Sequence, residues 1–197
     1  MASNKNKKTD RRAELLNIAR EIFAEKGFEA TTISEIVARA GVAQGTFYWY
    51  FPSKNSLMVA LAKEMRHQIK RTLLNSYSQS EDLQTMIEKS VTGAFRIMEQ
   101  YRDVLTIIRF SATHWLGTPS DRERVFSSYY SLIAEMINRE QAKGVIADDI
   151  NGNVMAVLIV GTVYYAAEEC YVYNSTIPVE IFIAQCTHYI QRALGLK

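Results

Sequence analysis

The stretch QGTFYWYFPSK, residues 44–54, combines small polar side chains with five closely spaced aromatic rings. A glutamine amide such as that of Gln44 can form two hydrogen bonds with adenine, and the methyl and hydroxyl groups of Thr46 suit contact with thymine. Gly45 has no side chain, so the backbone there can approach a partner closely. On an exposed helix these three residues would suit contact with base edges in a major groove. The alternative is that Gly45 is simply a residue of a helix start.

The spacing of the five rings divides them into two groups. Phe47 and Phe51 are four residues apart, so they share one face of a helix, and we expect both in the core. The remaining rings then project from the exposed side together with Gln44, and they are Tyr48, Trp49 and Tyr50. A tyrosine can bury its ring and still donate a hydroxyl hydrogen bond to a phosphate.

Two short helices flanking the turn AGVA must position these residues, which predicts a helix-turn-helix. Thr32 and Glu35 have the spacing of a capping box at the start of the first helix. Gly41 ends that helix and permits the turn. The second helix is expected from Gln44 to Tyr50. Pro52 and Ser53 follow it, and Ser53 is a good N-cap for a longer helix.

In the N-terminal segment, a disordered stretch is expected to give way to a helix at Thr9 or Asp10. Residues 1–9 are polar and basic, and we expect them to be disordered. Apolar residues then recur at three- and four-residue spacing, which predicts one amphipathic helix capped by Thr9 or Asp10 and ended by Gly27.

The rest of the chain also has helical periodicity. We expect helices at Lys54 to about Leu74 and at about 82–101, 103–116, 121–143, 151–173 and 178–193. The fold class expected is therefore all-α with about nine helices, divided into a helix-turn-helix domain over residues 1–53 and an all-helical domain over 54–197. Only three prolines occur in 197 residues, which suits long helices.

Charge is distributed unevenly along the chain. Residues 1–75 hold 13 Lys and Arg against 7 Asp and Glu, whereas residues 76–197 hold 10 against 14. The first part therefore carries +6 and the remainder −4. A basic N-terminal part favours an anionic partner, and nucleic acid above all.

Other classes of protein find little support in the sequence. No apolar run approaches about 18 residues, so no membrane partner or span is expected. The two cysteines lack CxxC spacing and indicate ordinary thiols in a cytoplasmic protein. The three histidines show no metal-binding spacing, and no nucleophile or phosphate-loop motif is present, so we expect no catalytic residue, metal or cofactor. A helical protein-docking module is the remaining alternative.

The stretch from Gly27 to Leu57 resembles the TetR family of transcriptional regulators. The matching residues are Gly27-Phe28, Thr31-Thr32-Ile33, Ile36, Ala40-Gly41-Val42, Gly45-Thr46-Phe47-Tyr48, Phe51 and Ser53-Lys54 with Leu57. With the helix before it, this segment covers about a quarter of the chain.

The resemblance implies roles at the matching positions. Phosphate contacts are implied for Thr32, Tyr48 and Lys54. Tyr50 is added to this set because its own hydroxyl could donate to a phosphate. Base contacts are implied for Gln44, Gly45, Thr46 and Trp49. The sequence departs from the family at two places. Ala43 replaces a frequent serine, which removes a capping hydroxyl. The Trp49-Tyr50 pair is bulky where many relatives carry Arg, Lys or His.

The resemblance also implies a homodimer that binds a palindromic operator in double-stranded DNA, mostly as a ligand-released repressor in the cytoplasm, associated with the nucleoid. The helices at about 151–173 and 178–193 would form the dimer interface, since the first is apolar nearly all round. A single-chain core without a dimer is the alternative, and activation is the alternative to repression. Ligand binding would move the helix that begins at Lys54.

The effector site is expected among the middle helices, with an unknown lipophilic small molecule as its ligand. Aromatic, apolar and polar candidates are Phe95, Met98, Arg109, Phe110, His114, Trp115, Tyr129, Tyr165 and Glu168. Arg109 could bind an acidic ligand, and Glu168 or Glu169 could bind a cationic one. Alternatively Arg109 pairs with a carboxylate of the protein, and no charged ligand is involved.

Overall fold

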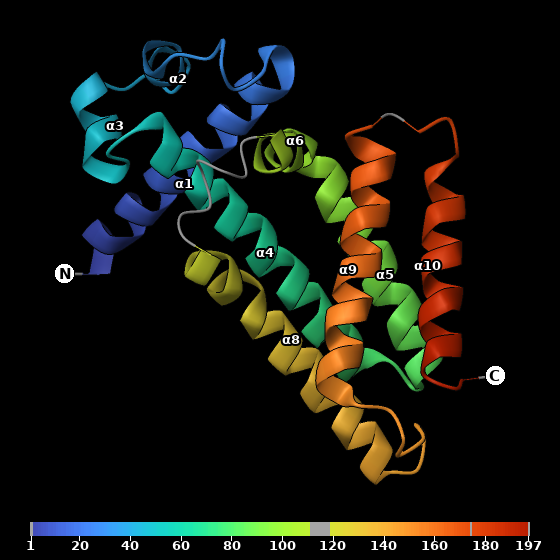
Figure 1. The fold of residues 1–197 in the computed structure, drawn as a ribbon. Coiled ribbons are helices and arrows are strands. Elements are labelled where there is room, and N and C mark those ends of the chain that lie inside the picture. The colour runs from blue at the N-terminus through green and yellow to red at the C-terminus, as the bar shows by residue number, and fades with distance from the viewer. Residues whose placement is uncertain (1, 111–118, 174, 197) are drawn as a thin grey trace. The chain divides into compact units, whose positions relative to one another are not determined.

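The computed structural model describes residues 2–110, 119–173 and 175–196, with side chains described for 11–107, 129–173 and 175–196. Nine helices and no strand lie in those ranges (Figure 1), which confirms the all-α fold. The helices are α1 Ala2–Lys26, α2 Ile33–Arg39, α3 Gln44–Tyr50, α4 Lys54–Gln79, α5 Leu83–Gln100, α6 Arg102–Phe110, α8 Pro119–Ala142, α9 Gly152–Tyr171 and α10 Val179–Ala193.

Two helices are longer than the sequence predicts. α1 begins at Ala2, although residues 1–9 were expected to be disordered. Its first turns contain neither proline nor glycine, so nothing in the sequence stops the helix there. α4 continues past Leu74 because its last turn makes tertiary contacts. The hydroxyl of Tyr77 donates to Glu140 Oε1 at 3.1 Å, and Ser76 is buried.

The chain forms two compact units whose division differs from the expected boundary after residue 53. The first unit comprises Met1–Met65 and Tyr101–Trp115, and the second comprises Arg66–Gln100 and Leu116–Lys197. α4 therefore contributes its first turns to one unit and its remainder to the other. α6 belongs to the first unit, because it packs on α1.

The core of the first unit draws side chains from all of its helices. Fully buried residues are Leu15, Ala19 and Phe23 of α1, Ile36 of α2, Phe47 of α3, Leu57 of α4, and Val104 and Leu105 of α6. Phe51, directly after α3, is also buried, with its ring centroid 5.7 Å from that of Phe47. These contacts confirm that Phe47 and Phe51 belong to the core.

In the second unit, α5, α9 and α10 pack against one another, and α8 packs along α9 (Figure 1). The core includes Phe95 of α5, Ile137 of α8, Ala156 of α9 and Ile190 of α10.

α9 contains an apolar stretch of membrane-spanning length, although the sequence was expected to hold no apolar run approaching about 18 residues. Among the described residues it is the one helix long and apolar enough, by length and composition alone, to cross a membrane. Only 17% of its most apolar window is buried within the chain. One such helix is weak evidence for a membrane span, since helices of soluble proteins also pass this criterion.

Replacing Phe47 by alanine should remove the ring that fixes α3 on the core. We expect the free energy of unfolding of the first unit to fall by about 3–5 kcal/mol. The matched control is Trp49→Ala on the same helix, where the side chain is 71% exposed and the loss should stay within about 0.5 kcal/mol. Urea unfolding followed by circular dichroism measures both, and equal midpoints for the two variants would contradict this core placement.

Candidate nucleic-acid interface

The first turn and outer face of α3 are open to solvent. Gln44 and Gly45 are exposed, Thr46 is half-buried, and Trp49 is among the most exposed large apolar side chains described. A Cβ atom added at Gly45 would have no neighbour within 4 Å. The four residues expected to contact bases therefore lie in one short helix, and nothing in the described part of the chain covers Gly45.

Two tyrosines border this face. The side chain of Tyr48 is 49% exposed, while Tyr50 is half-buried. The ring of Tyr48 packs edge-on against Phe47, with 5.7 Å between centroids. Tyr48 therefore packs its ring against a core residue while about half of its surface stays exposed.

The turn between α2 and α3 has the predicted geometry. Gly41 has φ +62°, in the left-handed region that favours glycine. The Val42 amide donates to the Val37 carbonyl at 3.0 Å and closes the end of α2. Ala43 occupies the N-cap of α3 and supplies no side-chain cap, as its replacement of serine predicts.

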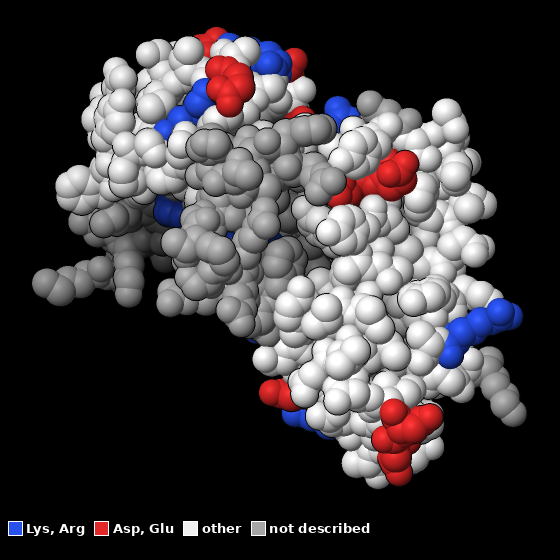
Figure 2. Space-filling model, in the orientation of Figure 1, with Lys and Arg blue, Asp and Glu red and all other residues white. Residues whose placement is uncertain are grey.

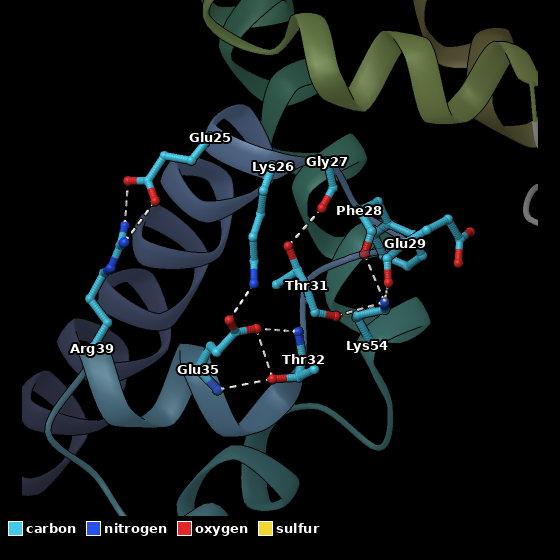
Figure 3. Close-up of polar contacts among 10 residues, drawn as sticks. All are labelled: Glu25, Lys26, Gly27, Phe28, Glu29, Thr31, Thr32, Glu35, Arg39 and Lys54. Atoms are coloured by element: carbon cyan, nitrogen blue, oxygen red, sulfur yellow. Dashed lines mark hydrogen bonds and ion pairs between the residues drawn. The ribbon is translucent and has the colours of Figure 1, made fainter.

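The capping box of α2 is confirmed in full (Figure 3). The Glu35 amide donates to Thr32 Oγ1 at 3.3 Å, and Glu35 Oε2 accepts from both the amide and the hydroxyl of Thr32 at 2.8 Å. Both donors of Thr32 are therefore engaged within the protein. A phosphate contact by this hydroxyl would require it to leave Glu35.

Two ion pairs that sequence inspection did not single out join α1 to α2 (Figure 3). Lys26 pairs with Glu35, and Arg39 binds Glu25 through two parallel bonds of 2.6 and 2.7 Å. Glu25 and Arg39 are 14 residues apart, so no helical spacing could indicate their pairing.

These pairs also shift the acidity of the carboxylates. The ammonium of Lys26, followed by the backbone amide and hydroxyl of Thr32, lowers the pKa of Glu35 to about 2. The hydrogen bonds from Arg39 lower the pKa of Glu25. Both carboxylates are exposed, so bulk salt screens these interactions.

Lys54 does not point freely into solvent. Its Nζ donates to the carbonyl oxygens of Phe28 at 2.7 Å, Glu29 at 3.3 Å and Thr31 at 2.8 Å (Figure 3). At the start of the same helix, Ser53 Oγ accepts from the Ser56 amide at 3.1 Å, which confirms Ser53 as the N-cap. The structure thus gives Lys54 partners other than the phosphate that the family resemblance implies.

The residues proposed for an effector site are only partly described. Phe95, Met98, Tyr129 and Glu168 are buried in the second unit. The Tyr129 hydroxyl donates to the Arg66 carbonyl, and the ring centroids of Phe95 and Tyr171 are 6.2 Å apart.

The other five candidates are either exposed or have side chains that the structure does not describe. Tyr165 is 63% exposed in the single chain. Arg109 and Phe110 lie in α6, in the first unit, with side chains that are not described, and His114 and Trp115 fall outside the described residues. The effector site therefore stays a prediction. Among described residues, no group of three potential ligands could hold a metal ion.

The geometry defines a class of protein. Two short helices joined by a glycine turn, with an exposed polar first turn on the second helix, form a helix-turn-helix of the kind that contacts DNA. The family model described as bacterial regulatory proteins, tetR family, matches residues 15–61. The model described as tetracyclin repressor-like, C-terminal domain, matches residues 83–194. The chain belongs to the TetR family of DNA-binding transcriptional regulators, as its sequence motif predicts.

One known relative matches nearly the whole chain, and another matches somewhat more than half of it. The uncharacterized HTH-type transcriptional regulator YvdT of Bacillus subtilis (strain 168) is 30% identical over 183 residues, which are 92% of this chain and 94% of that protein. The HTH-type transcriptional repressor KstR2 of Rhodococcus jostii is 27% identical over 113 residues, covering 57% of this chain and 55% of that protein.

Solved structures share the fold at lower identity. The fatty acid degradation regulator FadR from Bacillus halodurans superposes with a TM-score of 0.76 at 17% identity, over 91% of this chain and 94% of that one. FadR from Bacillus subtilis, solved in complex with stearoyl-CoA, gives a TM-score of 0.71 at 18% identity, over 90% and 96%.

Replacing Glu35 by glutamine should change how the first unit responds to acid. Because the folded protein lowers the pKa of Glu35, its contribution to stability is present above the unfolded value of 4.5 and is lost as pH falls through about 2. We expect Glu35→Gln to unfold at lower temperature than the wild type at pH 7. The difference should shrink between pH 4.5 and 2.

Thermal unfolding at a series of pH values measures this effect. Glu29→Gln, at an exposed position in the same connection, controls for the loss of one carboxylate. A difference between Glu35→Gln and the wild type that stays constant from pH 7 to pH 2 would argue against the shifted pKa.

Proposed function

We propose that this protein is a homodimeric repressor that binds a palindromic operator through α3 and releases it when a lipophilic small molecule binds. The observation that carries the proposal is the outer face of α3, where Gln44, Gly45 and Trp49 are exposed and Thr46 is half-buried. Polar side chains and an open backbone there suit direct contact with base edges.

Contacts to the DNA backbone would position this helix. Tyr48 and Tyr50 border the base-contacting face, and their hydroxyls suit phosphate oxygens. Thr32 could contribute if its hydroxyl exchanged Glu35 for a phosphate. The excess of basic residues in the first 75 positions supplies the long-range attraction for DNA.

A second copy of the chain is the proposed partner of α9 and α10. Large apolar side chains exposed on these helices and the segment between them are Val154, Val157, Leu158, Tyr165, Tyr173, Ile177, Ile181 and Tyr189. Figure 2 shows that much of the surface around α9 carries neither acidic nor basic side chains. A patch of this kind is costly to expose to water, and a two-fold partner would bury it. This explains the apolar α9 without a membrane.

The two-fold arrangement would also suit the operator. Paired recognition helices about 34–36 Å apart fit successive major grooves, so protein symmetry predicts a palindrome. A repressor is favoured over an activator because the relative KstR2 is named a repressor. The protein would act in the cytoplasm, where it meets DNA.

An effector would act by shifting the equilibrium between a DNA-binding state and a released state of the protein. α4 supplies Lys54 to Met65 to the first unit and continues from Arg66 in the second, so a ligand bound in the second unit could act through this helix. The ligand shifts the equilibrium only by its different affinity for the two states. The stearoyl-CoA complex of FadR from Bacillus subtilis supports a lipophilic ligand.

Selection of random-sequence duplex DNA on the purified protein, with bulk DNA as competitor, tests the function. Recovery of a palindromic consensus is expected, and lipophilic compounds can then be screened for its release. Failure to enrich any sequence at any salt concentration, with the protein folded, would contradict the proposed operator binding.

Gln44→Ala, carried through the same selection, should relax discrimination at one base pair in each half-site. Loss of a bidentate contact is worth about 1–3 kcal/mol of discrimination. The matched control is Gln68→Ala on α4, outside the proposed contact surface. An unchanged consensus for Gln44→Ala would remove this residue from the set that contacts bases.

Leu158→Glu should disrupt the proposed dimer by placing a charge in its apolar interface. We expect the molecular mass in solution to fall to that of one chain, 22.4 kDa, and operator affinity to fall with it. Val145→Glu is the matched control, because Val145 is an exposed apolar residue, at 46%, outside α9 and α10. Light scattering after size-exclusion chromatography measures the mass, and a Leu158→Glu dimer as stable as the wild type would contradict this interface.

A further inference from the structure

We propose that Lys54 is a positioning residue, whose ammonium fastens the connection between α1 and α2 to the first turn of α4 instead of binding a DNA phosphate. The inference rests on the proposed function only where DNA binding is measured. It assigns Lys54 a role different from the one implied by family resemblance.

The donors of Lys54 are already engaged. An ammonium group has three N–H donors, and three carbonyl oxygens, those of Phe28, Glu29 and Thr31, lie at 2.7 to 3.3 Å from Nζ. A phosphate could be bound only by displacing one of these acceptors. The carbonyl that was released would then need another donor.

The ring of Phe28 holds the same cation from another side. Lys54 Nζ lies 4.3 Å from the ring centroid, within the range of a cation–π interaction. Phe28 is itself 5% exposed and packs against Phe23, with 5.1 Å between centroids. The cation is therefore fixed by a side chain anchored in the core as well as by the backbone.

The segment that Lys54 binds determines where α2 begins. It starts at Gly27, with φ +83°, and Thr31 Oγ1 closes it by donating to the Gly27 carbonyl at 2.7 Å. The next residue, Thr32, is the N-cap of α2. Figure 3 shows Lys54 reaching this segment from α4, on the side away from the Lys26–Glu35 pair.

The consequence is a mechanical link between α4 and the helix-turn-helix. α3 packs on α2, so a fixed start of α2 helps to fix the orientation of α3. Lys54 ties that start to the helix that continues into the second unit. The lysine thus acts on DNA binding through the placement of α2 and α3.

Two substitutions separate the positioning role from phosphate binding. Lys54→Met keeps most of the side-chain length but removes all three donors. Lys54→Arg keeps the charge, and a guanidinium would bind a phosphate at least as well as an ammonium. Its planar fork cannot converge on three carbonyl oxygens in the same way. Lys63→Met, at an exposed position on the same helix, is the matched control.

Hydrogen exchange of the free protein tests the link without DNA. In both Lys54 variants we expect amides in residues 27–36 to exchange at least tenfold faster than in the wild type, while amides in α9 exchange at the wild-type rate. In Lys63→Met, amides in both segments should exchange at the wild-type rate. Wild-type exchange in both Lys54 variants would overturn the proposal. If Lys54→Met fails to fold, the same comparison is made with Lys54→Arg.

The salt dependence of DNA affinity supplies the second measurement. Both Lys54 variants should bind all sequences at least tenfold more weakly, with the slope of log affinity against log salt unchanged. Loss of a phosphate contact would instead lower that slope by about 0.9 for each bound subunit. A lowered slope in Lys54→Met, together with wild-type affinity in Lys54→Arg, would show phosphate binding. Because exchange is measured without DNA, failure of the wild type to bind any operator would contradict the proposed function alone.

Discussion

The burial of Phe47 and Phe51 is the constraint on which the first unit depends. α3 has only two turns and no side-chain cap, so its own hydrogen bonds are too few to stabilise it. The two rings fix its rotation about its axis, because residues four apart must face the core together. Once that rotation is fixed, Gln44, Tyr48 and Trp49 are directed outward by the helical period. Packing and the proposed DNA contact are therefore two results of one pattern in the sequence.

Much of this unit follows from local rules. The capping box at Thr32, the positive φ at Gly41 and the uncapped start at Ala43 are each determined by residues within four positions. The contacts that sequence inspection missed join distant positions, such as Glu25 with Arg39 and Lys54 with the Phe28 carbonyl. Neither pairing has a periodic signal, because both depend on how helices meet. The extension of α1 to Ala2 shows a further limit, since polar composition did not prevent a helix.

The second unit is less predictable in its function than in its fold. The helical periodicity of the sequence predicts the bounds of α5, α8, α9 and α10 to within a few residues. Apolar side chains such as Phe95 and Met98, however, are equally typical of a protein core and of a site for a lipophilic ligand. The sequence therefore distinguishes helices from turns, but it does not distinguish residues that line a ligand site from residues of the core. α9 illustrates the same ambiguity, because a helix covered by a partner subunit and a helix covered by lipid both carry apolar residues nearly all round.

Gly45 lies at an open surface position of α3. Inside a helix, glycine is less favourable than alanine by about 1 kcal/mol. A methyl group at this position would meet open space, so the fold itself gives no steric reason for glycine. Many side chains could be substituted here without disturbing the core. New binding preferences could therefore arise in this regulator by exchange at one surface position, with the scaffold left intact.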